Sequence, residues 1–126
     1  MKERTLTKVE FQIMSILWDL GHPACGHDIL ERYPEPKPTY TTIASYMRIL
    51  FEKGFVEYTK REGEGKTQWY KTTISRQDYT RQTMQEVKRN FFDGSLKSMF
   101  SFFVQEEKLS ADDIQQLLDE INRRQP

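Results

Sequence analysis

Short hydroxyl side chains and one arginine recur at helical spacing in the middle of the chain. Thr41, Ser45 and Arg48 lie at positions i, i+4 and i+7 of one stretch, so they share one face of a predicted helix. The opposite face is apolar and consists of Ile43, Met47 and Leu50. A helix that enters the major groove of DNA needs short polar side chains toward the base edges and an Arg or Lys for guanine or phosphate. The pattern predicts such a helix, and an ordinary solvent-exposed polar face is the alternative.

Two further groups of polar residues flank this stretch. Thr39 is placed to cap the N-terminus of the helix, where free N–H groups suit a phosphate, and Thr42 lies beside the polar face. The charged, glycine-containing segment that follows the helix adds three cations, Lys60, Arg61 and Lys66. We expect these cations to contact flanking phosphates or the minor groove, which adds affinity rather than sequence discrimination.

Basic residues concentrate in the middle third of a chain that is neutral overall. The sequence has 19 Lys and Arg against 19 Asp and Glu. Residues 37–73 hold seven basic and four acidic side chains, whereas residues 1–36 and 74–126 are net negative. Any phosphate-facing surface should therefore lie in the middle third. A solvated charged face would be the simpler interpretation if this bias stood alone.

The elements that must position these residues follow the order of a winged helix-turn-helix. A capping box opens a first helix over residues 7–20, and a second, short helix spans about residues 26–33. Three prolines separate it from the third helix, which runs from residue 39 until a glycine closes it at residue 54. Two runs rich in Val, Thr, Tyr and Trp, residues 55–59 and 67–74, then predict an antiparallel hairpin with a charged tip.

The C-terminal part of the chain is helical by pattern and carries a broad apolar stripe. Helix starts are predicted at Ser75 and Ser110, and Gly94 interrupts the run between them. The stripe consists of Phe91, Leu96, Met99, Phe100, Phe103, Val104, Ile114, Leu117, Leu118 and Ile121. Exposed apolar patches of this kind mark interfaces, so we expect an isologous homodimer. Packing of these helices back on the N-terminal domain is the alternative.

Together these patterns predict a mostly α-helical protein with a small β-hairpin (α+β). A winged helix-turn-helix DNA-binding domain would span residues 1–74, and a helical dimerisation segment would span residues 75–126. The leading hypothesis is a sequence-specific transcriptional repressor that binds double-stranded operator DNA of two-fold symmetry. The second hypothesis is a winged-helix protein-interaction module without specific DNA binding, since function does not follow from fold.

Two other motifs do not lead to a site. Residues 65–67 (Gly-Lys-Thr) are similar to the end of a phosphate-binding P-loop, but Lys60 occupies the position of its first glycine and a strand follows in place of a helix. His22, Cys25 and His27 lie close in sequence, but a closed zinc site needs about four ligands and no second pair is present. Since no nucleophile with a base and no paired acids stand out either, we predict no enzyme activity, metal or cofactor.

The composition indicates the cellular compartment in which such a protein would act. The 126 residues include one cysteine, Cys25, so no internal disulfide can form, as is usual in a reducing compartment. Residues 1–8 are polar and do not form a signal peptide, and no stretch approaches the roughly 18 apolar residues of a membrane span. We therefore expect a cytoplasmic protein without a membrane partner.

Motifs along nearly the whole chain carry a family resemblance. They are Leu6-Thr7-x-x-Glu10, Ile13-Met14-x-x-Leu17-Trp18, Thr42-Ile43 with Leu50, Lys53-Gly54-Phe55, Tyr70, and the pattern from Gly94-Ser95-Leu96 to Leu109-Ser110. In this order and spacing they resemble the penicillinase and methicillin-resistance repressor family (the BlaI/MecI/CopY type). The resemblance implies a cytoplasmic dimeric repressor of antibiotic-resistance or stress genes that binds palindromic operators. It also implies release when a sensor protease triggers cleavage of the dimerisation segment.

The chain differs from that family at three places. Phe102-Phe103 stands where the cleavage site of relatives often reads Asn-Phe. The C-terminal cysteine cluster of the copper-responsive branch has no counterpart, which excludes copper sensing by that route. Ile49 stands where relatives often place Arg in the second half of the recognition helix, so their operator preference does not transfer to this chain.

Overall fold

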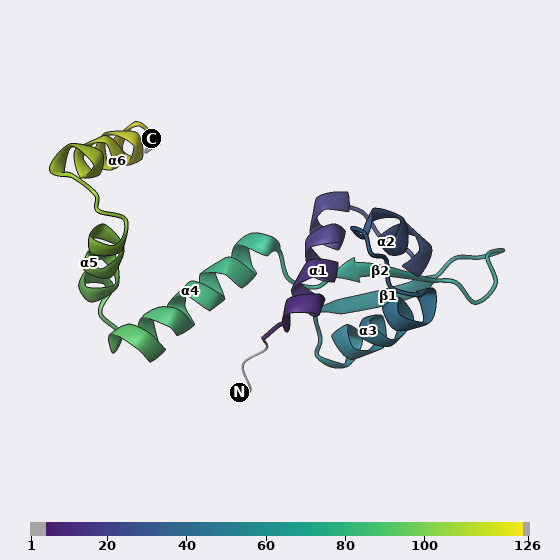
Figure 1. The fold of residues 1–126 in the computed structure, drawn as a ribbon. Coiled ribbons are helices and arrows are strands. Elements are labelled where there is room, and N and C mark those ends of the chain that lie inside the picture. Colours follow the sequence, from purple (N-terminus) through teal and green to yellow (C-terminus); the bar gives the residue numbers. More distant parts are fainter. Residues whose placement is uncertain (1–4, 125–126) are drawn as a thin grey trace. The chain divides into compact units, whose positions relative to one another are not determined.

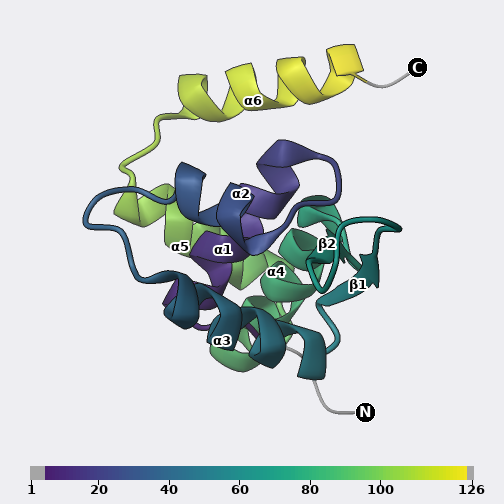
Figure 2. The same ribbon diagram turned by 90° about the vertical axis from the view of Figure 1, so that its right-hand side faces the viewer.

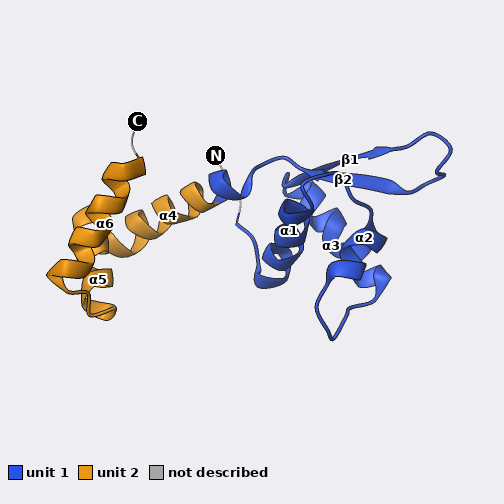
Figure 3. Cartoon of the chain, turned by 90° about the horizontal axis from the view of Figure 1, so that it is seen from above, with its two compact units in different colours: residues 1–79 blue, residues 80–126 orange. Residues whose placement is uncertain are grey.

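A computed structural model describes residues 5–124 of the chain; residues 1–4, at the start of the polar N-terminal segment, and residues 125–126 lie outside the described part. In chain order the elements are α1 (Lys8–Leu20), α2 (Gly26–Arg32), α3 (Tyr40–Glu52), β1 (Val56–Lys60), β2 (Gln68–Thr72), α4 (Arg76–Phe92), α5 (Leu96–Glu106) and α6 (Ala111–Arg124) (Figure 1). The expected α+β class is confirmed. The chain divides into two compact units, residues 1–79 and 80–126 (Figure 3).

Local sequence signals set the ends of the first three helices. The Thr7 hydroxyl accepts the Glu10 N–H and the Glu10 carboxylate accepts the Thr7 N–H, which confirms the predicted capping box of α1. Gly21, at φ 70°, ends that helix in the left-handed conformation that a side chain disfavours. Helix α2 ends at Arg32, one residue earlier than expected, and the Lys37 ammonium group donates to the carbonyls of its last turn.

The two strands form the predicted antiparallel hairpin, with the three helices gathered on one side of it (Figure 2). The register pairs Val56 with Thr72 and Lys60 with Gln68. Strand β1 is therefore shifted by one residue from its predicted range, 55–59, and β2 is shorter than its predicted range, 67–74. A third chain segment extends the sheet, because Ala24 and Tyr70 exchange backbone hydrogen bonds of 2.9 and 2.8 Å. The sequence patterns did not predict this bridge, which joins the α1–α2 connection to β2.

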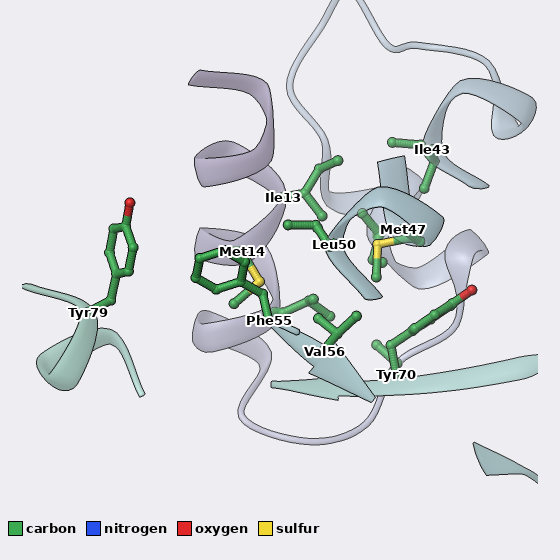
Figure 4. Close-up of a cluster of buried hydrophobic side chains, with 12 residues drawn as sticks. Ile13, Met14, Ile43, Met47, Leu50, Phe55, Val56, Tyr70 and Tyr79 are labelled. Carbon is green, nitrogen blue, oxygen red and sulfur yellow. The ribbon is translucent and has the colours of Figure 1, made fainter. Parts of the chain in front are cut away.

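The core of the first unit lies between the helices and the hairpin (Figure 4). Its members are Ile13, Met14, Leu17, Ala24, Ile29, Ile43, Met47, Leu50, Phe55, Val56, Tyr70 and Tyr79. Every apolar residue predicted for the inner face of α3 is among them. The spacing of apolar residues in the short second helix predicts that both Ile29 and Leu30 are buried, but only Ile29 is; Leu30 is partly covered at the edge of this cluster, because neighbouring residues of an α-helix point about 100° apart.

A charge pair at the edge of the core connects α1 to the end of α3. The Glu10 side chain is 4% exposed, and its Oε1 lies 2.7 Å from the Nζ of Lys53, whose side chain is 35% exposed. Burial by itself would raise the pKa of Glu10, but hydrogen bonds from Lys53 and from the Thr7 N–H hold that pKa below its ordinary value. The carboxylate is therefore ionised at neutral pH and ties the C-terminus of α3 to the N-terminus of α1.

The first turn of α4 belongs to the first unit. Ser75 caps the helix by accepting the Asp78 N–H, as its sequence pattern predicted. Tyr79 reaches into the core, where its hydroxyl accepts the Leu6 N–H and its ring contacts those of Phe11, Trp18 and Phe55. The start of α4 is thereby fixed to α1.

The second unit comprises the rest of α4 together with α5 and α6. Ser95 caps α5 by accepting the Ser98 N–H, and Ser110 with Asp113 forms a reciprocal cap at the start of α6. The same bonds from Ser110 hold the pKa of Asp113 below its ordinary value. Among the described residues of this unit no large apolar side chain is fully buried. Its helices are thus set by local capping and not by a core of their own.

Candidate nucleic-acid interface

The outer face of α3 carries the polar side chains that the sequence placed there. Thr41, Ser45 and Arg48 are all exposed, and the Arg48 side chain is 79% exposed. The opposite face of α3 is completely buried at Ile43 and Met47. Because the core holds the inner face, the axis of α3 can approach a groove only with the hydroxyl-bearing face in front.

The N-terminus of α3 is closed by two threonine hydroxyls. Thr39 Oγ1 accepts the Thr42 N–H at 3.1 Å and lies 2.9 Å from Thr42 Oγ1. Both side chains are exposed, but their hydroxyls already hydrogen-bond each other. This end of the helix therefore offers an anion its remaining first-turn N–H groups, the one hydroxyl hydrogen that the mutual bond does not use, and the positive end of the helix dipole.

Arg48 has one acidic neighbour on the same face. Its Nε lies 4.0 Å from Oε1 of Glu52, one turn further along α3. Both side chains are more than two-thirds exposed, and such surface pairs contribute little to stability. The guanidinium can therefore exchange this partner for a base edge or a phosphate at small cost.

The three predicted cations of the hairpin lie at the end of β1 and in the tip. Lys60 is in register with Gln68 at the end of the ladder, and Arg61 follows it in the tip. The Arg61 guanidinium carbon lies 3.6 Å from the centroid of the Trp69 ring, a close cation–π contact. Lys66 is exposed in the same tip, where Gly63 and Gly65 supply positive φ values. The sequence patterns did not assign Trp69 a role, because its contact with Arg61 depends on the hairpin register, which pairs Trp69 with Thr59.

Aromatic rings join α3 to the hairpin. Phe51 on α3 lies 5.0 Å from Tyr58 on β1, and Tyr58 lies 5.9 Å from Tyr70 on β2, measured between ring centroids. Burial, and then the neighbouring Tyr40 and Tyr58, raise the pKa of Tyr70, so its hydroxyl stays protonated and donates to the Gln68 side chain at 2.6 Å. The geometry of the hairpin relative to α3 is thus set by packed rings.

The second unit exposes most of its predicted interface residues. The exposed members of the stripe are Phe91, Leu96, Phe100, Phe103, Leu117, Leu118 and Ile121, and the half-buried members are Met99, Val104 and Ile114. Phe91 is 77% exposed. Two further apolar residues that the sequence patterns left out, Met84 and Phe102, are also exposed, and Phe102 contacts the rings of Phe92 and Phe103.

The His and Cys residues near α2 have separate local environments. Cys25 is buried at the N-cap of α2, where its N–H donates to Asp28, and His22 contacts the Pro23 carbonyl. His27 stacks on Tyr40 at 4.4 Å. Over residues 5–124 no three His, Cys, Asp or Glu side chains come together in a way that could hold a metal ion, and no helix there is long and apolar enough to cross a membrane.

Comparison with known proteins gives matches over nearly the whole chain. The family model described as penicillinase repressor matches residues 6–123. The methicillin resistance regulatory protein MecI of Staphylococcus aureus (strain N315) is 24% identical over 123 residues, which cover 98% of each chain. The penicillinase repressor of Bacillus licheniformis is 24% identical over 112 residues, 89% of this chain and 85% of that protein. A solved structure of PerR from Streptococcus pyogenes matches with a TM-score of 0.47 and 18% identity, over 54% of this chain and 47% of that chain.

Proposed function

The chain belongs to the penicillinase repressor family, and we propose that it represses antibiotic-resistance or stress genes as a homodimer bound to a palindromic operator. As a member of that family it is a DNA-binding transcriptional repressor and not an enzyme. The names of its relatives, which refer to methicillin resistance and penicillinase, support the choice of genes. A sensor protease that inactivates the repressor is a further part of the proposal.

The main support for the proposed mode of DNA binding is the exposed polar face of α3. Thr41, Ser45 and Arg48 lie exposed along it, and their helix is anchored by a completely buried opposite face. We assign α3 to the major groove, with Ser45 and Thr41 toward base edges and Arg48 toward a guanine or a phosphate. Thr39 and Thr42 would approach the backbone at the start of the helix. The cations of the hairpin, Lys60, Arg61 and Lys66, would contact flanking backbone.

The homodimer rests on the apolar surface of the second unit. A single chain leaves large side chains such as Phe91, Leu96 and Phe100 open to solvent, and a concentration of exposed apolar side chains usually marks an interaction surface. A two-fold axis through these helices would place two copies of α3 on two half-sites of a palindrome.

The DNA-binding mode is tested by measuring the affinity of the full chain for the duplex upstream of its own gene and for a scrambled duplex at about 150 mM salt. Arg48→Ala should weaken binding about 5- to 150-fold and relax specificity at one base position. Lys66→Ala is the matched control, since loss of a phosphate contact weakens both duplexes similarly and lowers the salt slope by about 1. Equal affinity of the unaltered protein for the two duplexes would refute specific repression and favour a protein-interaction module.

The homodimer is tested by sedimentation of the full chain and of Phe100→Glu. The unaltered chain should sediment as a dimer, whereas a carboxylate in the apolar interface should yield monomers because it would be desolvated without a partner. Gln105→Glu, on the opposite side of the same helix and exposed, is the control and should remain dimeric. A monomeric unaltered chain would contradict the proposal.

A further inference from the structure

Ile49 of α3 has an exposed aliphatic side chain that is not part of the hydrophobic core. It is 37% exposed. Successive residues of an α-helix are about 100° apart around the helix axis. Ser45 is therefore roughly opposite the buried Met47. Arg48 and Ile49 lie on either side of Ser45, at similar angles from it. If Arg48 reaches DNA from this face, Ile49 is placed to reach it on the other side of Ser45.

Ile49 lies in a shallow hollow together with short hydroxyl side chains and one aromatic ring. This hollow is lined by Thr39, Thr41, Thr42, Ser45, Tyr46 and Ile49. The hydroxyls of Thr39 and Thr42 hydrogen-bond each other, and Thr39 also accepts the Thr42 N–H. Thr41 and Ser45 contribute the hydroxyls that face base edges in the proposed binding mode, and the hydrocarbon of this hollow comes from Ile49 and the half-buried Tyr46.

One base-edge group in the major groove matches such a surface. Among the four bases only thymine presents an apolar group there, its C5-methyl, whereas the other edges present nitrogen and oxygen donors or acceptors. An isoleucine pressed against one of those polar edges would displace water without replacing its hydrogen bonds, which is unfavourable. Contact between Ile49 and a methyl group instead buries apolar surface on both sides.

We propose that Ile49 reads the C5-methyl group of a thymine in each operator half-site, on the other side of Ser45 from the base or phosphate that Arg48 contacts. This inference rests on the proposed function, since it requires α3 to enter the major groove. It gives the operator a requirement for thymine at one position per half-site. Burial of one methyl group corresponds to about fourfold in affinity for each thymine, and to about fifteenfold when both half-sites of a dimer are changed.

The test removes the methyl group and leaves the rest of the base in place. A high-affinity duplex is selected from a random pool with the full-length protein, and each thymine in it is replaced singly by deoxyuridine, which keeps O4 and the base pairing. Affinities are measured by fluorescence anisotropy at fixed salt for the unaltered protein, Ile49→Ala and Ile49→Val. At one thymine per half-site, deoxyuridine should lower the DNA affinity of the unaltered protein and of Ile49→Val about fourfold. The affinity of Ile49→Ala should be nearly unchanged.

Two results would overturn the inference while leaving the proposed function intact. In the first, replacement of thymine by deoxyuridine lowers the affinity at no position. In the second, the replacement lowers the affinity of Ile49→Ala as much as that of the unaltered protein. In both cases the unaltered protein would still bind the selected duplex more tightly than a scrambled one. If the unaltered protein selects no sequence from the pool, the inference and the proposed function both fail.

Discussion

The ion pair between Glu10 and Lys53 makes the stability of the winged-helix unit sensitive to one substitution at the end of α3. Lys53→Met retains most of the hydrocarbon length of the side chain and removes the ammonium group 2.7 Å from Glu10 Oε1. The carboxylate then remains buried, with the hydrogen bonds of the α1 capping box as its partners. We expect Lys53→Met to destabilise this unit at neutral pH.

The magnitude follows from the exposure of the two partners. Loss of one partner from a fully buried pair costs about 3–5 kcal/mol, whereas fully exposed pairs contribute about 0.2–1 kcal/mol. Glu10 is buried, but about a third of the Lys53 side chain is in contact with solvent, which screens the interaction. We therefore expect the free energy of unfolding to fall by about 2 kcal/mol at pH 7.

The effect should depend on pH in a defined direction. The pKa of Glu10 is lowered in the folded protein, so its ionisation stabilises the fold above the unfolded pKa of about 4.3, and this contribution is lost as the pH falls through the folded pKa. Without Lys53, burial predominates and the folded pKa of Glu10 rises. The difference between the two proteins should thus be largest near pH 7 and should narrow toward pH 3.

Urea denaturation of the full chain followed by tryptophan fluorescence measures this difference. Both tryptophans of the sequence, Trp18 and Trp69, belong to the first unit, so the signal reports its unfolding. Lys71→Met is the matched control. Lys71 pairs with Glu57 across the hairpin at 3.1 Å, but both side chains are more than half exposed, so its loss should cost about 0.5 kcal/mol or less. Equal costs for the two variants, or a Lys53 effect that persists unchanged at pH 3, would refute the reasoning.

Two further predictions concern DNA affinity and are measured by fluorescence anisotropy. Glu52→Gln should raise affinity about two- to fivefold, because it removes a carboxylate 4.0 Å from Arg48 on the outer face of α3; weaker binding would show instead that Glu52 contacts a base. Trp69→Ala should lower affinity about threefold and reduce the salt dependence of binding, because the Arg61 guanidinium loses the ring on which it stacks. An unchanged affinity and salt slope would show that Trp69 does not position Arg61 for a phosphate.

Helix ends and helix faces could be predicted because their causes are local. The capping hydroxyls of Thr7, Thr39 and Ser75 bond to N–H groups three residues away, so the spacing of residues suffices to locate them. The apolar period of α3 likewise determines which of its faces is buried. The polar face with Ser45 and Arg48 was therefore visible in the sequence.

Contacts between distant residues could not be predicted in this way. The Ala24–Tyr70 bridge, the Glu10–Lys53 pair and the Tyr79 hydroxyl bond to Leu6 join segments more than 40 residues apart. Nothing in the local pattern of these side chains says which partner they meet, because that depends on how the helices pack on the hairpin.

The candidate site likewise has some features with local causes and others that depend on contacts between segments. Residue types and helical period alone indicated which side chains of α3 face outward and that the C-terminal helices carry an uncovered apolar stripe. Only the tertiary structure placed Arg61 on Trp69 and packed Phe51 of α3 against Tyr58 of the hairpin. The physical reason is range: a helix face is defined within two turns of one segment, whereas the partners available to a side chain are decided by whichever segments the core brings beside it.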